Sequence, residues 1–269
     1  MKIDIEKIVD ILAEVTTTVI LPKFRNLEEN EISAKSSPND LVTVTDIAAE
    51  AALEKMLAPI YPGAAFVGEE RAASDPTIMN GLLQEGASWV IDPIDGTRNF
   101  IRGKEEFGSI LALVINGEVE YGFIYAAPLG KCAIAIKGEG AYWDGEKIRT
   151  NPKPKGETQG LRSMGWLHEP YNTDLVRNLR SEFVTEPAHC SAYGYIELAH
   201  GEYDFSFYSR VHPWDHLAGG LLLNELGGRL AFVDDEANLT PAPSADRPML
   251  VTAPGRNWRE IKDKLWPTT

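Results

Sequence analysis

Cysteine and long apolar runs are both scarce in this 269-residue sequence. The two cysteines, Cys132 and Cys190, are far apart and lack metal-binding spacing, so we expect no disulfide framework and a reducing compartment. Residues 1–11 carry three acidic side chains, which a secretory signal peptide would not. The longest apolar runs, such as 110–115, are too short to span a membrane. The sequence therefore predicts a cytoplasmic protein that does not bind membranes.

Basic residues are also outnumbered, because 26 lysines and arginines face 40 aspartates and glutamates, for a net charge of −14. They form no run, which argues against nucleic acid as a partner. If the ligand of so acidic a protein is a phosphate, its charge must be neutralised locally, and bound cations can do this. With 43% hydrophobic residues, the chain has the composition of an ordinary globular protein, with one large domain or two coupled halves.

Apolar periodicity and turn residues predict an alternation of helices and strands. Helices are expected at 4–21, 46–60, 171–180, 192–200 and 215–226. Strands are expected at 41–45, 64–67, 89–91, 107–115, 118–126, 131–137, 161–166, 183–185, 203–208, 228–233 and 249–252. The Asn-Gly pair at 116–117 indicates a hairpin, and 138–158 has the composition of a connector. This order predicts one compact unit with an α+β half over 1–150 and an α/β half over 151–269.

The stretch 89–100 combines a buried strand with an aspartate-rich turn. Pro93 has no N–H for a sheet ladder, so we expect the strand to end at Asp92. Residues 95–97, Asp-Gly-Thr, then have the pattern of a turn that opens a short helix. Two carboxylates beside free backbone N–H groups suit a hard cation and a phosphate, although an ordinary surface turn has the same composition.

Six carboxylates fall at the end of a predicted strand or the start of a predicted helix: Asp46, Glu69, Glu70, Asp92, Asp95 and Asp215. Taken singly, each has a structural explanation, and Asp46, at or near a helix N-cap, would do no more than cap the helix. Together they mark the edge where open α/β proteins bind ligands. Mutual repulsion would raise their pKa values unless a cation were bound, and an all-oxygen set selects Mg²⁺ or Mn²⁺. A zinc site at His212 and His216 is disfavoured, because Pro213 separates them and no third ligand is suggested.

Several motifs occur together in one order along the chain: Lys35-Ser36-Ser37-Pro38, Asp40-Leu41-Val42-Thr43, Thr45-Asp46, Gly68-Glu69-Glu70, the stretch 89–100, Trp214-Asp215 and Gly227-Gly228. In this set the chain resembles the inositol monophosphatase family of Mg²⁺-dependent, lithium-sensitive phosphatases. The resemblance implies a layered αβαβα sandwich of the inositol monophosphatase and fructose-1,6-bisphosphatase type. It also implies a homodimer.

The resemblance implies two or three Mg²⁺ ions in one site, with Mn²⁺ also able to bind. Glu69, Asp92 and the backbone carbonyl of Ile94 would hold the first ion. Asp92, Asp95 and Asp215 would hold the second, and a weaker third ion would share Glu69.

The same resemblance assigns catalysis to Asp46, Thr97, Glu69 and Glu70. Thr97 would be hydrogen-bonded to Asp46, and this pair would orient and deprotonate the attacking water, while Glu70 would act through water beside the metals. The backbone N–H groups of Gly96 and Thr97 would bind phosphate oxygens at a helix N-terminus. Attack on phosphorus would be in line, without a covalent phosphoenzyme.

Substrate binding is implied for a wider set: Lys35, Asp95, Gly96, Thr97, Ser191, Ala192, Tyr208 and Arg210. Ser191 and Ala192 match the family, whereas Tyr208 occupies a position where animal-type members carry an inositol-binding glutamate. Residues 193–195, Tyr-Gly-Tyr, are similar to the histidinol-phosphate branch. Arg210 is either a surface cation or a ligand for a second phosphate or a carboxylate on the substrate.

The function predicted first is hydrolysis of a small polyol or sugar phosphate, with inositol 1-phosphate as the leading substrate. Fructose bisphosphate, a 3′-phosphorylated nucleotide and histidinol phosphate remain open within the same chemistry. A different class is a regulatory protein that binds the transcription or translation machinery and whose catalysis is incidental. The strong acidity argues against direct RNA binding.

Overall fold

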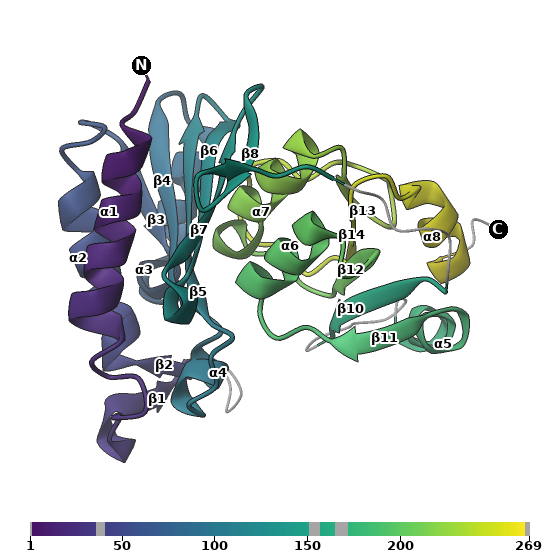
Figure 1. Cartoon of the computed structure of the whole chain (residues 1–269), viewed down its shortest axis with the longest axis horizontal. Helices are drawn as coiled ribbons and strands as arrows, with labels where there is room; N and C mark the ends of the chain where they lie inside the picture. The colour runs from purple at the N-terminus through teal and green to yellow at the C-terminus, as the bar shows by residue number, and fades with distance from the viewer. Residues whose placement is uncertain (1, 36–40, 151–156, 165–171, 267–269) are drawn as a thin grey trace.

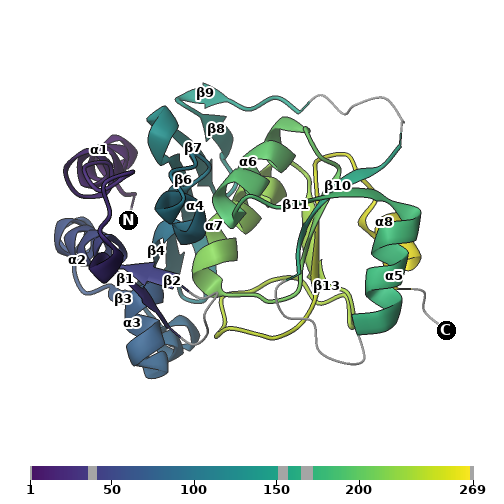
Figure 2. The ribbon, with the colours of Figure 1, turned by 90° about the horizontal axis from the view of Figure 1, so that it is seen from below.

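Layers of helices and sheets alternate along the long axis of the molecule, as Figure 1 and the view from below in Figure 2 show. Two N-terminal helices cover a seven-stranded sheet, a central pair of helices separates it from a five-stranded sheet, and two further helices close the other side. The predicted αβαβα order is therefore confirmed. The computed structural model describes residues 2–35, 41–150, 157–164 and 172–266.

Predictions in three parts of the chain touch residues outside these ranges. Residues 36–40, which belong to two of the motifs, lie outside the described residues. So do 151–156, which adjoin the expected boundary between the two halves, and the end of the strand expected at 161–166. The division of the chain at residue 150 stays a prediction.

The first layer consists of α1 (Ile5–Val15) and α2 (Val44–Leu57). The apolar face of α1 is buried over the larger sheet, at residues such as Ile8 and Leu12. The helix predicted at 4–21 does not stay α-helical, because Thr16–Ile20 form a π-helical turn. Here the hydroxyl of Thr17 donates to the carbonyl of Ala13 at 2.8 Å, and such a bond competes with backbone donors.

The larger sheet has the strand order β3-β4-β5-β6-β7-β8-β9. Its strands are β3 (Ala65–Gly68), β4 (Ala87–Asp95), β5 (Gly108–Ile115), β6 (Glu118–Ala126), β7 (Lys131–Ile136), β8 (Gly140–Trp143) and β9 (Glu146–Lys147). The antiparallel run from β5 to β7 and the hairpin at 116–117 are confirmed. The connector expected at 138–158 is wrong in its first part, because β8 and β9 extend the sheet there. Gly138 and Gly145 supply the positive φ values of the turns before these strands.

The central layer consists of α6 (Ser191–His200) and α7 (Pro213–Glu225). The smaller sheet has the order β11-β10-β12-β14-β13 and mixes parallel and antiparallel pairs. Its strands are β10 (Gln159–Ser163), β11 (Val184–Pro187), β12 (Phe205–Tyr208), β13 (Arg229–Phe232) and β14 (Met249–Thr252). Its outer face is covered by α5 (Asn172–Glu182) and α8 (Trp258–Leu265). The sequence analysis missed α8, which Asn257 caps at its N-terminus.

Short elements complete the chain around the larger sheet: β1 (Ile32–Ala34), β2 (Leu41–Thr43), α3 (Glu69–Ser74) and α4 (Thr97–Ile101). Segments of 3-10 helix occur at Glu29–Glu31, Pro76–Leu83 and Ala127–Leu129. Among the described residues, no helix combines the length and the apolar character needed to cross a membrane.

Small residues let the central helices approach their neighbours closely. A β-carbon on Gly122 of β6 would lie 2.9 Å from backbone atoms of Ala218 in α7. A β-carbon on Gly219 of α7 would lie 2.2 Å from the ring of Tyr195 in α6. These contacts fix the position of α7, and with it the residues at its N-terminus, against the larger sheet.

Gly219→Ala tests the tight contact between α6 and α7. The new β-carbon would meet the fully buried ring of Tyr195, so we expect the free energy of unfolding to fall by roughly 2 kcal/mol. Gly220→Ala is the matched control, because its β-carbon would come no closer than 3.3 Å to the neighbouring atoms and alanine has the higher helix propensity. Urea unfolding measures both variants, and equal stabilities would contradict the packing argument.

Candidate metal centre and active site

Three aspartates from distant parts of the chain come together at one point. Asp92 and Asp95 lie on β4, and Asp215 is in the first turn of α7. One carboxylate oxygen of each lies within 4.8 Å of the others. Asp92 and Asp95 are buried and Asp215 is partly buried. The structure therefore brings together three of the six carboxylates in one cluster, which the sequence placed at the ends of separate elements.

We predicted that the strand carrying Asp92 and Asp95 would end at Asp92, but it does not. β4 continues to Asp95, and its register with β5 shifts between Asp92 and Asp95. The other neighbour, β3, pairs only as far as Ile91, so Pro93 lies beyond that ladder and within the irregular part. The Pro93 carbonyl accepts a hydrogen bond of 2.7 Å from the hydroxyl of Ser109. Proline is tolerated because the strand is bulged there.

Burial and mutual repulsion dominate the electrostatics of this cluster. Burial raises the pKa of Asp92 well above its usual value, and neighbouring carboxylates, led by Glu69, add repulsion. Burial also raises the pKa of Asp215, and Asp95 raises it further. The pKa of Asp95 rises to about 6, although its carboxylate accepts a 2.6 Å hydrogen bond from the Ala192 N–H. Such a group of carboxylates favours either protonation or a bound cation.

The hydrogen bonding of one carboxylate oxygen indicates whether a metal ion fits the cluster. Oδ1 of Asp92 is buried and has no hydrogen-bond partner in the part of the chain that the structure describes. An unpartnered buried carboxylate oxygen costs free energy. A divalent cation held by Asp92, Asp95 and Asp215 would satisfy it, and hard oxygen ligands suit Mg²⁺. These residues therefore fit a metal centre.

A second acidic pair, Glu69 and Glu70 at the start of α3, already holds a positive charge. The Nζ of Lys35 lies 2.7 Å from Oε1 of Glu69 and 2.8 Å from Oε1 of Glu70. Burial alone would lower the pKa of Lys35, but the two carboxylates outweigh burial and raise it. Burial, with repulsion from Glu69, raises the pKa of Glu70 to about 8. The predicted substrate ligand Lys35 is thus bound to two predicted catalytic residues.

Asp46 lies near the N-terminus of α2, as predicted. Thr43 is the N-cap, and Asp46 is the third helical residue, where its Oδ2 accepts hydrogen bonds from the Thr43 N–H at 2.8 Å and from the Thr43 hydroxyl. Its Oδ1 lies 3.1 Å from the hydroxyl oxygen of Thr97, which is also 3.0 Å from the carbonyl oxygen of Ile94. Burial raises the pKa of Asp46 to about 6 despite these bonds. The contact implied between Asp46 and Thr97 is present.

Gly96 connects β4 to α4 in a conformation that favours glycine. Its φ is +90°, and a β-carbon there would lie 3.0 Å from the carbonyl oxygen of Glu106 and 3.1 Å from Cβ of Cys190. The N–H groups of Gly96 and Thr97 thus begin a helix beside the carboxylate cluster. They are the groups that a phosphate would meet there.

A cavity of about 690 Å³ opens beside these groups. It is lined by seven of the predicted site residues: Glu69, Asp95, Gly96, Thr97, Ser191, Tyr208 and Asp215. Arg210 does not line it, and the Arg210 guanidinium is 2.9 Å from Oδ1 of Asp246 in an ion pair that is open to solvent. Of the two alternatives for Arg210, the structure favours the surface cation.

The sequence analysis missed Glu50, which lies on α2 one turn after Asp46. Its buried carboxylate accepts hydrogen bonds from the N–H groups of Glu70 at 2.8 Å and Arg71 at 3.0 Å, and so caps the N-terminus of α3. A β-carbon on Gly68 would lie 2.3 Å from this carboxyl group. Asp46 and Glu50 are four positions apart and so lie on the same face of α2, and this spacing could have identified Glu50 from the sequence. Glu50 positions the segment that carries the acidic pair.

Three basic residues were also missed, and all three line the cavity: Arg98, Arg102 and Lys104. They are spread over seven positions rather than forming a run, so the sequence contains no basic tract to mark them.

Comparisons with known proteins agree over nearly the whole chain. A model of the inositol monophosphatase family matches residues 4–266. An inositol-1-monophosphatase of Bacillus subtilis (strain 168) is 32% identical over 215 residues, 78% of this chain and 78% of the relative. The fructose-1,6-bisphosphatase/inositol-1-monophosphatase of Thermotoga maritima is 30% identical over 216 residues, 78% of each chain. A solved structure of an IMPase/NADP phosphatase with Mg²⁺ and phosphate has a TM-score of 0.82 at 22% identity and covers 98% of this chain and 95% of that chain.

The fold, the carboxylate cluster and these matches define the class of the protein as a metal-dependent phosphatase. The chain belongs to the inositol monophosphatase family. The resemblance carried by the sequence motifs is thereby confirmed.

The raised carboxyl pKa values predict how stability depends on pH in the metal-free protein. Burial raises the pKa values of Glu50 and Glu70 to about 7 and about 8 and raises that of Asp92 well above its usual value, so the folded chain holds protons that the unfolded chain releases. The free energy of unfolding should therefore fall between pH 6.5 and pH 8, by about 1.4 kcal/mol per pH unit for each extra proton held. Buried His216, with a pKa lowered by burial to about 3, has the opposite effect on stability, which is largest below pH 6.5 and small above about pH 7.

Urea unfolding in a chelator at both pH values measures this slope. Mg²⁺ should raise stability more at pH 8 than at pH 6.5, because it replaces the protons. Asp92→Asn should flatten the slope, since it removes a carboxyl group that holds a proton in the folded chain. A slope that is unchanged by both Mg²⁺ and Asp92→Asn would contradict the assignment to this cluster.

Glu50→Ala tests whether capping of α3 supports the metal centre. The variant leaves the N–H groups of Glu70 and Arg71 without their carboxylate, so we expect about ten-fold more Mg²⁺ to be needed for half-maximal thermal stabilisation. Glu54→Ala, one turn along α2, removes only a solvent-facing partner of Arg71 and should leave the Mg²⁺ midpoint unchanged. Equal midpoints for the two variants would show that Glu50 does not position the site.

Proposed function

We propose that the protein is a Mg²⁺-dependent phosphomonoesterase that hydrolyses a phosphate ester of a small polyol or sugar, with inositol 1-phosphate as the leading substrate. The observation that carries the proposal is the buried, unpartnered Oδ1 of Asp92 within a three-carboxylate cluster beside a cavity of about 690 Å³. A cavity of that volume is typical of small-molecule sites. The names of the two relatives, which both include inositol-1-monophosphatase, support the choice of substrate.

The carboxylates would divide between two or three ions. Asp92, Asp95 and Asp215 would hold one Mg²⁺, and Glu69, Asp92 and the carbonyl of Ile94 would hold another, with a weaker third ion sharing Glu69. Lys35 contacts only Oε1 of Glu69, so Oε2 is left for a metal. Bound Mg²⁺ would supply positive charge to phosphate oxygens and lower the pKa of a water molecule. Mn²⁺ suits the same oxygen ligands.

Thr97 and Asp46 would handle the attacking water. The Thr97 hydroxyl has one proton, and donation to Oδ1 of Asp46 leaves the lone pairs of the Thr97 oxygen to accept a hydrogen bond from water. With its pKa raised by burial to about 6, Asp46 is ionised at neutral pH and basic enough to receive the proton. Glu70, the neighbour of Glu69 in the chain, would act through a further water molecule.

Phosphate would bind at the start of α4. The N–H groups of Gly96 and Thr97 would donate to its oxygens, which places phosphorus beside the carboxylate cluster. The rest of the substrate would occupy the cavity against Ser191 and Tyr208, which line its other side. The expected homodimer and cytoplasmic location remain predictions.

Phosphate release from inositol 1-phosphate tests the proposal. We expect turnover with Mg²⁺, loss of turnover with a chelator, and inhibition by Li⁺. Asp46→Asn should lower kcat by roughly 100-fold or more, because it removes the general base. Asp10→Asn makes the same chemical change on the exposed side of α1 and should leave kcat unchanged. Parallel assays with fructose 1,6-bisphosphate, 3′-phosphoadenosine 5′-phosphate and histidinol phosphate rank the alternative substrates.

Two results would count against this mechanism. Turnover that persists in the chelator would exclude the metal-dependent route, and full activity of Asp46→Asn would exclude Asp46 as the base. If no ester is hydrolysed although Mg²⁺ still stabilises the fold, the regulatory binding role becomes the better account.

A further inference from the structure

Two basic residues, Arg102 and Lys104, form what we call the basic pair at the cavity. Arg102 is the C-cap residue of α4, Lys104 follows two residues later, and both side chains line the cavity that also contains Asp95 and Asp215. The chain as a whole has a net charge of −14. The basic pair therefore places positive charge in the cavity of a protein whose net charge is negative.

The basic pair has no counter-charge of its own. In the described ranges of the chain, no hydrogen bond or ion pair involves the side chain of either residue. Two carboxylates of this region are not paired with either cation: Glu105 is 3.2 Å from the Arg25 guanidinium, and Glu186 of the cavity wall accepts a 3.1 Å hydrogen bond from a tyrosine hydroxyl. An anion that enters the cavity would thus meet two cations that are not already neutralised.

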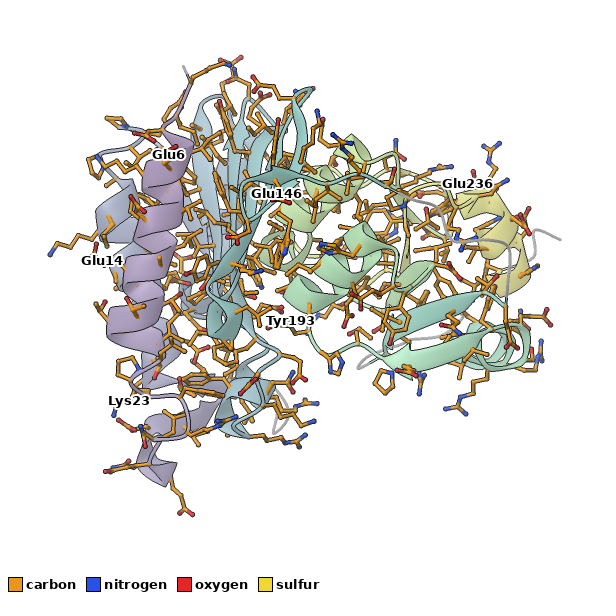
Figure 3. The ribbon with its side chains drawn as sticks, in the orientation of Figure 1. Glu6, Glu14, Lys23, Glu146, Tyr193 and Glu236 are labelled. Atoms are coloured by element: carbon orange, nitrogen blue, oxygen red, sulfur yellow. The ribbon has the colours of Figure 1, made fainter. Side chains whose placement is uncertain are left out.

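The loop that carries the basic pair is held in place from both sides. Tyr193 of α6, labelled in Figure 3, donates a 3.0 Å hydrogen bond from its hydroxyl to the carbonyl of Glu105. The Nε of Arg25, from the N-terminal layer, donates at 3.0 Å to the carbonyl of Gly103. The backbone around Lys104 is therefore fixed before any ligand binds, which lowers the entropic cost of binding.

The basic pair lies at and beyond the end of α4, away from the N–H groups that begin the helix. Arg102 lies five positions after Thr97, which at the helical rise corresponds to about 7.5 Å. The two phosphate groups of a hexose bisphosphate, or a phosphate and a carboxylate on a short carbon chain, span a distance of this order. One end of such a molecule could lie at Gly96 and Thr97 while the other reaches the basic pair.

We propose that Arg102 and Lys104 select substrates that carry a second anionic group, a phosphate or a carboxylate, remote from the scissile phosphate. The guanidinium can bind such a group through two hydrogen bonds, and the ammonium adds a point charge. This inference rests on the proposed phosphatase function and specifies its substrate class. A substrate with a neutral remainder, such as inositol 1-phosphate, would bind at the metal centre but gain nothing from the basic pair.

The experiment compares three substrates with the Mg²⁺-loaded full chain. Fructose 1,6-bisphosphate carries a second phosphate, 3-phosphoglycerate carries a carboxylate, and inositol 1-phosphate carries neither. In the double variant Arg102→Gln, Lys104→Gln, kcat/KM for a doubly anionic substrate should fall about ten-fold relative to that for inositol 1-phosphate, mainly through KM. The double variant Lys7→Gln, Lys55→Gln removes the same charge from exposed positions on α1 and α2 and should leave this ratio unchanged.

If kcat/KM falls most for fructose 1,6-bisphosphate in the variant Arg102→Gln, Lys104→Gln, the second group is a phosphate. If it falls most for 3-phosphoglycerate, the second group is a carboxylate. An unchanged ratio for both doubly anionic substrates would overturn the proposal. An equal fall in the control double variant would also overturn it, because the effect would then be long-range attraction rather than contact.

A failure of the phosphatase function would give a different result. If the wild-type protein hydrolyses none of the three esters, the same compounds can be titrated calorimetrically into the Mg²⁺-loaded protein without being consumed. The proposal then stands if Arg102→Gln, Lys104→Gln weakens binding of a doubly anionic compound about ten-fold relative to inositol 1-phosphate. Binding that is absent, or equal in both proteins, would overturn it.

Discussion

The carboxylate of Asp92 imposes the constraint on which the site depends. It is fully buried, one of its oxygens has no partner among the described residues, and other carboxylates crowd it. Such an arrangement is stable only with a proton or a cation in place. The cluster itself supports the second alternative, because all three of its members are carboxylates, which are the hard oxygen ligands that a divalent cation prefers.

A cation at this point would also join the two halves of the chain. Asp92 and Asp95 come from the larger sheet, whereas Asp215 comes from α7 in the central layer. The close contact of Gly122 with Ala218 and the 2.6 Å hydrogen bond from Ala192 to Asp95 hold these layers at the required separation. Metal binding and packing of the central layer are therefore coupled, since each depends on the position of α7.

Acidic and basic side chains from different parts of the chain line one cavity. Carboxylates gather where a metal ion would neutralise the scissile phosphate, while Arg102 at the end of α4 and Lys104 beyond it have no internal counter-charge in the described structure. An acidic protein can in this way attract a phosphate through bound cations and still distinguish substrates by the charge of their remainder. Inositol phosphates and sugar bisphosphates differ in this respect, although the reacting bond is the same.

The sequence by itself determined the features that depend on local pattern. Turn residues and alternation placed the strands from β5 to β7, and the family motifs identified Asp46, Thr97 and the three clustered aspartates. These predictions succeed because a strand end, a hairpin or a helix start is encoded within a few neighbouring residues.

Other features depended on contacts between distant segments, and only the tertiary structure decided them. β4 runs past Pro93 because β5 pairs with it across a bulge, and Arg210 forms an ion pair with Asp246 and does not line the cavity. Glu50 matters because α3 packs against it, 20 residues along the chain. The basic pair faces the site only because segments near 100, 190 and 215 enclose one cavity. No local sequence pattern predicts these contacts, because they form only when the layers pack against one another.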